Sequence, residues 1–232
     1  MKDSNIAING FFGRMGQAIY ELSLEQKFNV TLGVDKTEKL QSDLSLKLSD
    51  TLSKYQELFD VVIDFSLPDP CLNAVKECQI LNKPITIGTT GFNSEQKEIL
   101  VEASRDIPLL LAPNMSIGVN ATLRSISELS KILSKYEVSI EETHHKNKLD
   151  SPSGTALKIA EVVTKSRQSN SSDIKIESFR EEGEVGIHKT IFKSPDDEII
   201  LYHNAYNRKI FAQGALDTSQ SVSYTHLRAH ET

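Results

Sequence analysis

Short apolar runs alternate with helical patterns along the first half of the chain. Continuous runs such as "VVIDF" are typical of strands buried on both faces, as in a parallel sheet covered by helices. Runs with apolar residues three and four positions apart, such as "CLNAVKECQIL", predict amphipathic helices. The predicted strands lie at residues 5–8, 29–35, 60–66, 84–92 and 107–113, and the predicted helices at 15–26, 68–81 and 93–106. This order predicts a doubly wound parallel sheet up to about residue 113.

The pattern changes in the second half of the chain. The expected elements are a helix at 117–136, a strand at 137–145, a helix at 153–167, and strands at 174–181, 186–193 and 198–206. The last two strands are joined by "SPDDE", which is typical of a proline turn. Successive strands without helices between them predict a mixed or antiparallel sheet. The fold class is therefore α/β, with a parallel-sheet unit at 1–115 and a second, α+β unit at 116–207.

The final segment shows neither the helical nor the strand spacing of apolar residues. "FAQGALDTSQ" predicts the beginning of a helix at 208–220, and "SVSYTHLRAHET" at 221–232 continues it without clear apolar spacing. We interpret residues 221–232 as a non-native tail, with a genuine tail as the alternative, and leave them out of the functional reasoning.

Composition narrows the class of partner. The formal net charge is −6, which argues against nucleic-acid binding and against a polybasic membrane surface. Cys71 and Cys78 lie on one face of a predicted helix, too far apart to bridge, which predicts free thiols in a reducing compartment. The amino terminus leads into a strand without the apolar region of a signal peptide. We expect a cytoplasmic protein.

A glycine loop connects the first predicted strand and helix. "NGFFGRMG" places Gly10, Gly13 and Gly16 there, and Phe12 occupies the position of the usual second glycine. Such a loop lets the backbone approach a phosphate at the helix amino terminus, and Arg14 adds a charge. The spacing alone also suits an ordinary turn. Its place at the first strand–helix connection favours dinucleotide binding.

Further candidates follow later strands of the same sheet. Asp35 ends the second strand, where an acid hydrogen-bonds the ribose of NAD, whereas the adjacent Lys36 suits the phosphate of NADP. The segments 88–90 and 112–116 follow two other strands. Because the carboxyl ends of parallel strands meet at one edge, all of these residues should face one crevice. The preference between the two cofactors stays open.

His144 and His145 end a predicted strand, so their side chains should point to opposite faces. This arrangement is poor for two ligands of one metal, and the sequence indicates no set of Cys, Asp or Glu to supply the others, so no metal site is predicted. A polar loop with solvated histidines is the alternative to a functional role.

The residues that follow the two histidines favour a functional role over a solvated loop. Ser153, Gly154 and Thr155 open a helix, where free N–H groups form an anion site. The cationic Lys146 and Lys148 lie nearby in the sequence. The segment therefore suits a small carboxylate-bearing molecule, and a histidine or lysine there could donate a proton to it.

Five motifs together resemble a known family. In this order, "GFFGRMG", "IGTTGF", "APNMSIGVN", "EETHHKNKLDSPSGTA" and "FAQGAL" are similar to 4-hydroxy-tetrahydrodipicolinate reductase of bacterial lysine biosynthesis. The resemblance covers roughly residues 5–220. The glycine loop is generic, whereas the His-His-x-x-Lys-x-Asp-x-Pro-Ser-Gly-Thr-Ala run is specific.

The resemblance implies an NADH- or NADPH-dependent oxidoreductase that reduces a cyclic dicarboxylate with loss of water. It implies a Rossmann-like cofactor domain at 1–115, a substrate-binding and tetramerisation domain at 116–207, and a helix from 208–220 that returns to the first domain. The expected assembly is a homotetramer. The expected partner is a small dicarboxylate, with neither nucleic acid nor membrane.

The resemblance also implies residue roles. His144 and Lys148 would be the acid/base and proton-donor residues, and His145, Gly154 and Thr155 would hold the substrate carboxylates. The cofactor would be held by Gly10, Phe11, Phe12, Gly13, Arg14, Met15, Asp35, Lys36, Gly88, Thr89, Thr90, Ala112, Pro113, Asn114 and Met115.

Two alternatives belong to other classes. A redox-sensing dinucleotide module would keep the glycine loop but would not need His144, Lys148 and the anion site together. A shortened, inactive relic that still binds cofactor is the second alternative. A semialdehyde-dehydrogenase type of enzyme is disfavoured, because neither cysteine lies near the second unit.

Overall fold

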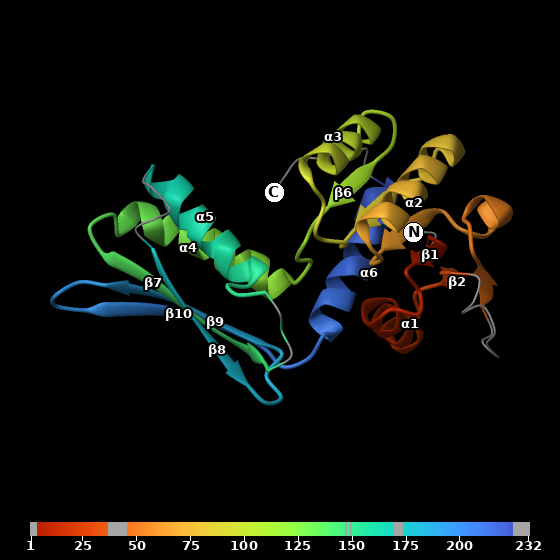
Figure 1. Ribbon diagram of the computed structural model, residues 1–232. Helices are drawn as coiled ribbons and strands as arrows, with labels where there is room; N and C mark the ends of the chain where they lie inside the picture. Colours follow the sequence, from red (N-terminus) through yellow and green to blue (C-terminus); the bar gives the residue numbers. More distant parts are fainter. Residues whose placement is uncertain (1–3, 37–45, 147, 149, 169–173, 225–232) are drawn as a thin grey trace. The chain divides into compact units, whose positions relative to one another are not determined.

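The computed structural model divides the chain into two compact units (Figure 1). One unit runs up to Met115 and takes in the segment from Lys209 onward, and the other is Ser116–Arg208. The structure describes residues 4–36, 46–146, 148, 150–168 and 174–224.

A six-stranded parallel sheet forms the centre of the first unit. Its strands are β1 (Ile6–Asn9), β2 (Val30–Val34), β3 (Lys47–Ser49), β4 (Val61–Asp64), β5 (Ile85–Ile87) and β6 (Leu109–Leu111), in the order β3-β2-β1-β4-β5-β6. The chain moves outward from β1 to β3 and then returns to continue from β4 to β6 on the other side. The point between β1 and β4 is where such sheets bind ligands, outside the carboxyl ends of the strands. The predicted Rossmann-like sheet is confirmed.

Helices cover both faces of this sheet. They are α1 (Arg14–Gln26), α2 (Pro68–Leu81), α3 (Ser94–Ala103) and α6 (Lys209–Tyr224), with a short 3₁₀ segment, η2 (Ser53–Leu58). Alternate residues of one strand belong to different cores: Ile6 and Ile8 pack with α1 and α6, whereas Ala7 packs with α2 and α3. The continuous apolar strands of the sequence follow from this double burial.

The helix α6 packs against α1, β4 and β5 of the first unit. Ala212, Ala215 and Leu216 are fully buried in the core that α1 shares. The helix continues through Tyr224, four residues past the boundary that the sequence suggested, and Val222 is buried within this extension. Burial of Val222 is a tertiary contact, which the weak local periodicity of the segment did not reveal.

Two further elements escaped the sequence analysis. The strand β3 has three residues and η2 six, which is too short for either hydrophobic period to emerge. Both cysteines are free and buried in α2, as predicted, and burial raises the pKa of each thiol.

The second unit has a mixed four-stranded sheet with two helices on one face (Figure 1). The strands are β7 (Glu137–His145), β8 (Lys175–Glu181), β9 (Gly186–Lys193) and β10 (Glu198–Ala205), in the order β10-β9-β7-β8, and the helices are α4 (Ile117–Ile132) and α5 (Gly154–Arg167). The strands β7 and β8 are parallel, and the other neighbours are antiparallel. The predicted mixed sheet is confirmed.

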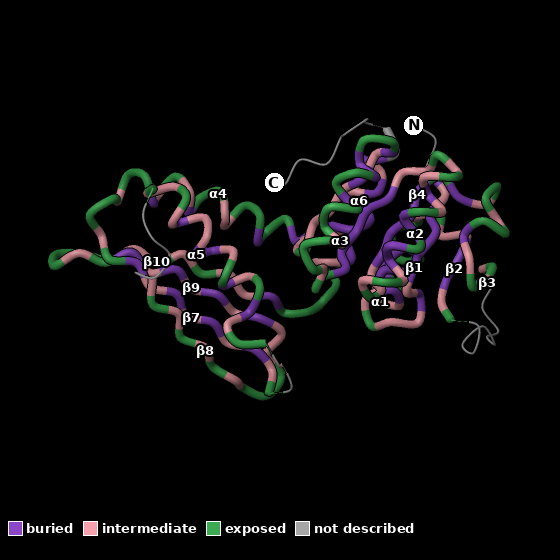
Figure 2. Tube along the Cα trace, turned by 45° about the horizontal axis from the view of Figure 1, so that its top comes forward, coloured by how far each residue is buried: buried purple, intermediate pink, exposed green. Residues whose placement is uncertain are grey.

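The two faces of this sheet differ. Val138, Ile140 and Phe192 pack beneath the helices, and the central strands β7 and β9 alternate buried with partly exposed positions (Figure 2). The opposite alternation leaves Phe179 and Tyr202, at the edge strands, 46% and 54% exposed. An antiparallel sheet with one packed face normally carries polar residues on the other face, so exposed aromatic residues there are unusual. Within the part of the chain that the structure describes, no helix has the length and apolar character needed to cross a membrane.

Substitution of Gly214 by alanine should destabilise the first unit. A Cβ there would lie 1.8 Å from the carbonyl oxygen of Met115, so α6 or the strand connection must move. Overpacking of this kind costs about 1–3 kcal/mol. The measurement is urea unfolding, with Asp217→Ala on the exposed face of the same helix as the control. An unchanged free energy of unfolding in Gly214→Ala would contradict this packing.

Candidate active site

The glycine loop forms a tight turn between β1 and α1. Gly10 has φ +78°, and a Cβ at this position would lie 2.5 Å from the carbonyl oxygen of Phe65. Only glycine fits this position. Gly13 is the N-cap of α1 and has no side chain to cap the helix, so the amino terminus of α1 is suited to an anion.

Asp35 lies beside this turn, directly after β2. Its carboxylate accepts hydrogen bonds from the N–H of Phe12 at 2.9 Å and from the N–H of Lys36 at 2.8 Å. The acid at the end of β2 and the glycine loop after β1 are thereby joined. This is the arrangement that a dinucleotide needs for its ribose and its pyrophosphate.

Three of the predicted cofactor residues are tied into the core. The Phe11 side chain is fully buried, and its backbone N–H and carbonyl bond Val34 and Gln17. The Thr89 hydroxyl donates to Asp64, and Met115 packs against α6. A cofactor would therefore meet the backbone around these residues. Arg14, Lys36, Thr90 and Pro113 are exposed, and Phe12, Gly13, Met15, Ala112 and Asn114 are partly exposed.

A buried polar network supports the same edge of the sheet. Asp64 ends β4 with no exposed surface and accepts hydrogen bonds from Asn9, Ser66 and Thr89. These bonds join the carboxyl ends of β1, β4 and β5. Asp64 was not among the predicted site residues, although an acid that ends an apolar run was a signal for it.

The second unit has one polar row across its helix-facing sheet surface. The strand register places Glu142 of β7 opposite Ser178 of β8 and His188 of β9, and His188 opposite His203 of β10. Towards the beginning of β7 the same face is mostly apolar, as at Val138 and Ile140. The polar row lies next to the amino terminus of α5, where the specific sequence motif is found.

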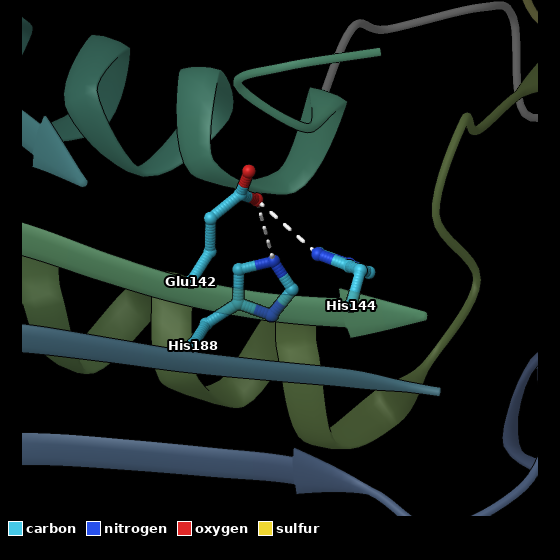
Figure 3. Close-up of side chains that lie close together, drawn as sticks. All are labelled: Glu142, His144 and His188. Atoms are coloured by element: carbon cyan, nitrogen blue, oxygen red, sulfur yellow. Dashed lines mark ion pairs between the residues drawn. The ribbon is translucent and has the colours of Figure 1, made fainter. Parts of the chain in front are cut away.

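Glu142 is the centre of this row. It has no exposed surface, and one carboxylate oxygen, Oε1, accepts the Ser153 N–H at 3.0 Å and the Ser178 hydroxyl at 2.7 Å. Oε2 lies 3.5 Å from His144 Nδ1 and 3.7 Å from His188 Nε2 (Figure 3). Burial opposes ionisation, but the hydrogen bonds from the two serines outweigh it and hold the pKa of Glu142 below its ordinary value.

The surroundings of both histidines favour their neutral forms. Burial lowers the pKa of His188 to about 4, and the adjacent His144 contributes to the decrease. Burial also lowers the pKa of His144, although Glu142 opposes the decrease. The Ser153 hydroxyl lies 3.2 Å from His188 Nε2 and accepts the Ala156 N–H, so its hydrogen is available to His188.

Two cationic side chains lie at the same end of the sheet. Lys148 Nζ is 2.9 Å from a carboxylate oxygen of Asp150, and Arg180 donates to the Asp150 carbonyl at 2.7 Å. Burial opposes ionisation of Asp150, but the hydrogen bond and charge of Lys148 outweigh it and lower its pKa. Arg180 lies opposite His144 in the register, 3.7 Å from Glu142. Arg180 was not among the predicted site residues, because only strand pairing brings it to the site.

The two adjacent histidines separate, as the strand alternation predicted. His144 faces the helices and is 7% exposed, whereas His145 is partly exposed on the opposite face of β7. Gly154 is the first residue of α5, after the N-cap Ser153, and an added Cβ there would meet open space. The candidate site therefore gathers around His144, Lys148 and the first turn of α5.

Glu142, His144 and His188 also have the composition of a metal site. One ligand atom from each lies within 4.8 Å of the others, so the acid that the sequence analysis did not find is present. Ser153 and Ser178 already occupy Oε1, and the Ser153 hydroxyl occupies His188 Nε2. Glu142 Oε2, His144 Nδ1 and His188 Nδ1 have no hydrogen-bond partner among the described residues. The serine hydrogen bonds to Glu142 Oε1 and His188 Nε2 would compete with a metal ion for these atoms, and the three residues are at the lower limit of the three or four protein ligands that zinc takes.

Comparison with known proteins covers both units. Residues 4–115 match the family model "Dihydrodipicolinate reductase, N-terminus", and residues 118–229 match "Dihydrodipicolinate reductase, C-terminus". The chain belongs to the dihydrodipicolinate reductase family. A 4-hydroxy-tetrahydrodipicolinate reductase of Nitrosospira multiformis is 36% identical, over 96% of this chain and 94% of the relative. That of Caldanaerobacter subterraneus is 35% identical, over 93% and 91%.

A solved dihydrodipicolinate reductase has the same fold. The dipicolinate-bound enzyme from Paenisporosarcina sp. TG-14 superposes with a TM-score of 0.81 at 24% identity, over 95% of this chain and 94% of that one. The resemblance found in the sequence motifs is confirmed at the level of the family and of the fold.

The low pKa of His188 predicts acid lability of this chain. Between pH 6.5, the ordinary value, and about pH 4, the unfolded chain binds a proton at His188 that the folded chain does not. The free energy of unfolding therefore falls as the pH is lowered through this window, by about 2 kcal/mol at pH 5.

His188→Gln should flatten this dependence. The variant should lose about 2 kcal/mol less than the parent chain between pH 7 and pH 5 in urea unfolding experiments. Equal losses in the two proteins would contradict a neutral, buried His188.

Proposed function

We propose that the chain reduces 4-hydroxy-tetrahydrodipicolinate to tetrahydrodipicolinate, with oxidation of NADH or NADPH and release of water, in the diaminopimelate route to lysine. Membership of the dihydrodipicolinate reductase family supports this reaction. The observation that carries it is the buried His144, with Lys148 beside it, at the end of the strand next to the amino terminus of α5.

The first unit would hold the cofactor. The backbone of the glycine loop and the free amino terminus of α1 suit the pyrophosphate, and Asp35 suits a ribose hydroxyl. Loops 88–90 and 112–115, at the same edge of the sheet, would complete the site. When bound, the reduced nicotinamide supplies a hydride.

The first turn of α5 would hold a substrate carboxylate. The N–H groups of Gly154 and Thr155 lie at the positive end of the helix dipole, and the space beside Gly154 is open. We also assign carboxylate binding to His145. Its side chain is on the opposite face of β7, so it would bind a different part of the dicarboxylate from the α5 turn.

His144 and Lys148 would move the protons. Hydride addition to a conjugated imine leaves negative charge on nitrogen, which must be protonated, and the departing hydroxyl leaves as water only when it gains a proton. Lys148 is a cationic donor that Asp150 positions. The neutral His144 can accept a proton and return it.

A redox-sensing module is the second candidate function. Such a module would need the glycine loop and Asp35 but would have no use for the buried Glu142–His144–His188 cluster. Oxidation of NADH or NADPH that depends on substrate separates the two functions.

The proposed activity predicts loss of NADH or NADPH absorbance that depends on freshly generated 4-hydroxy-tetrahydrodipicolinate. His144→Ala and Lys148→Ala should each lower kcat by about 10²–10⁴-fold, because each removes a proton-transfer group. Lys146→Ala, an exposed neighbour in the same loop, is the control and should keep kcat. Cofactor binding without substrate-dependent oxidation by the parent chain would favour the sensor.

His145→Ala separates binding from chemistry. A carboxylate contact made equally in the substrate and the transition state predicts a raised KM with kcat nearly unchanged. A large loss of kcat with unchanged KM would contradict the carboxylate role.

We further propose a cytoplasmic homotetramer. Phe179, Ile200 and Tyr202 are exposed on the face of the second sheet opposite the helices, which supports association of this face with another copy. Light scattering should give four times the 25.9 kDa of one chain. Ile200→Asp should give smaller species, whereas Ile80→Asp, an exposed apolar position on α2, should not. A tetramer that survives Ile200→Asp would contradict this interface.

A further inference from the structure

Glu142 is a buried carboxylate to which the proposed reaction assigns no proton-transfer step of its own. It has no exposed surface, and an ionised group is stable in such a place only when hydrogen bonds or opposite charges compensate the loss of water. Its two oxygens have different surroundings. The difference between them indicates what the residue does.

The oxygen Oε1 holds the beginning of α5. It accepts the N–H of Ser153 at 3.0 Å, and Ser153 is the N-cap residue whose hydroxyl in turn accepts the Ala156 N–H at 3.2 Å. The Ser178 hydroxyl on β8 bonds the same oxygen at 2.7 Å. The backbone immediately before Gly154 is therefore anchored to the centre of the sheet.

The oxygen Oε2 faces the proposed acid/base residue. It lies 3.5 Å from His144 Nδ1, and neither atom has a hydrogen-bond partner among the described residues (Figure 3). Both atoms are buried, so water does not compete for them. When His144 takes up a proton, its Nδ1–H has a carboxylate directly in front of it, and the other ring nitrogen is left for the substrate.

We propose that Glu142 is a positioning residue that couples the carboxylate-binding turn of α5 to His144, one oxygen fixing the turn and the other orienting and stabilising the protonated histidine. This assignment rests on the proposed reductase function. It gives the fully buried acid a role that neither the packing of the sheet nor the cofactor requires.

The charged groups around His144 shift its pKa in both directions. Burial and the positive charges of Lys148 and Arg180 favour its neutral form, whereas Glu142 and Asp150 favour the protonated form. Of these two carboxylates, Glu142 raises the pKa of His144 more than Asp150 does. The groups that face His144 are Glu142 from its own strand, Lys148 and Asp150 from the following loop, Arg180 from β8 and His188 from β9.

Two substitutions separate the tasks of the two oxygens. Glu142→Gln keeps an oxygen that can accept the Ser153 N–H but removes the charge in front of His144, whereas Glu142→Ala removes both. Glu141→Gln is the matched control, because Glu141 is the adjacent residue, lies on the opposite face of β7 and pairs with Lys189 at 3.1 Å.

The kinetic expectation is a split between kcat and KM. Glu142→Gln should lower kcat about tenfold or more with little change in KM, and should move the limb of the pH–rate profile that belongs to His144 to lower pH. Glu142→Ala should also raise KM, because the turn loses its anchor. Glu141→Gln should match the parent chain. Wild-type kcat, KM and pH profile in a folded Glu142→Gln would overturn the proposal.

A second measurement needs no substrate, so it tests the positioning role even if the proposed reaction fails. NMR titration of His144, assigned by its loss in His144→Gln, should move to lower pH in Glu142→Gln and stay in place in Glu141→Gln. Hydrogen exchange at the Ser153 amide should be faster in Glu142→Ala than in Glu142→Gln. An unmoved His144 titration, or equal exchange in the two variants, would overturn the proposal.

Discussion

The second unit depends on the compensation of one buried charge. Burial raises the pKa of Glu142 inside the sheet–helix layer, but hydrogen bonds from Ser153 and Ser178 outweigh this effect and favour the ionised form; Arg180 lies nearby. Those donors come from the start of α5 and from β8, segments far apart in the sequence. The need to satisfy the carboxylate therefore brings together the helix terminus, the parallel strand pair and the histidines.

The same constraint explains why the polar row lies at one end of the sheet. Over most of its length the helix-facing surface is an ordinary apolar core of Val138, Ile140 and Phe192. The polar residues begin where β7 approaches its last residue and α5 begins, where backbone N–H groups without helical partners are available. A buried acid nearer the beginning of β7 would lack such donors.

The candidate site of the first unit is built mainly from backbone groups. They belong to the turn at Gly10, the uncapped amino terminus of α1 and the carboxyl ends of the parallel strands. Side chains such as Asp64 and Thr89 hold these ends together from within the sheet. The two family models, which match residues 4–115 and 118–229, agree with this division into two units.

Local pattern by itself determined much of this protein. The parallel and mixed sheets, the bounds of α2, β7 and β9, and the separation of His144 from His145 follow from hydrophobic period and strand alternation, which are local properties. The short elements β3 and η2 and the last turn of α6 did not follow, because tertiary contacts stabilise them.

Only the tertiary structure decided the surroundings of His144. Glu142, Arg180 and His188 lie on three strands, and strand register, which no local pattern encodes, brings their side chains together around it.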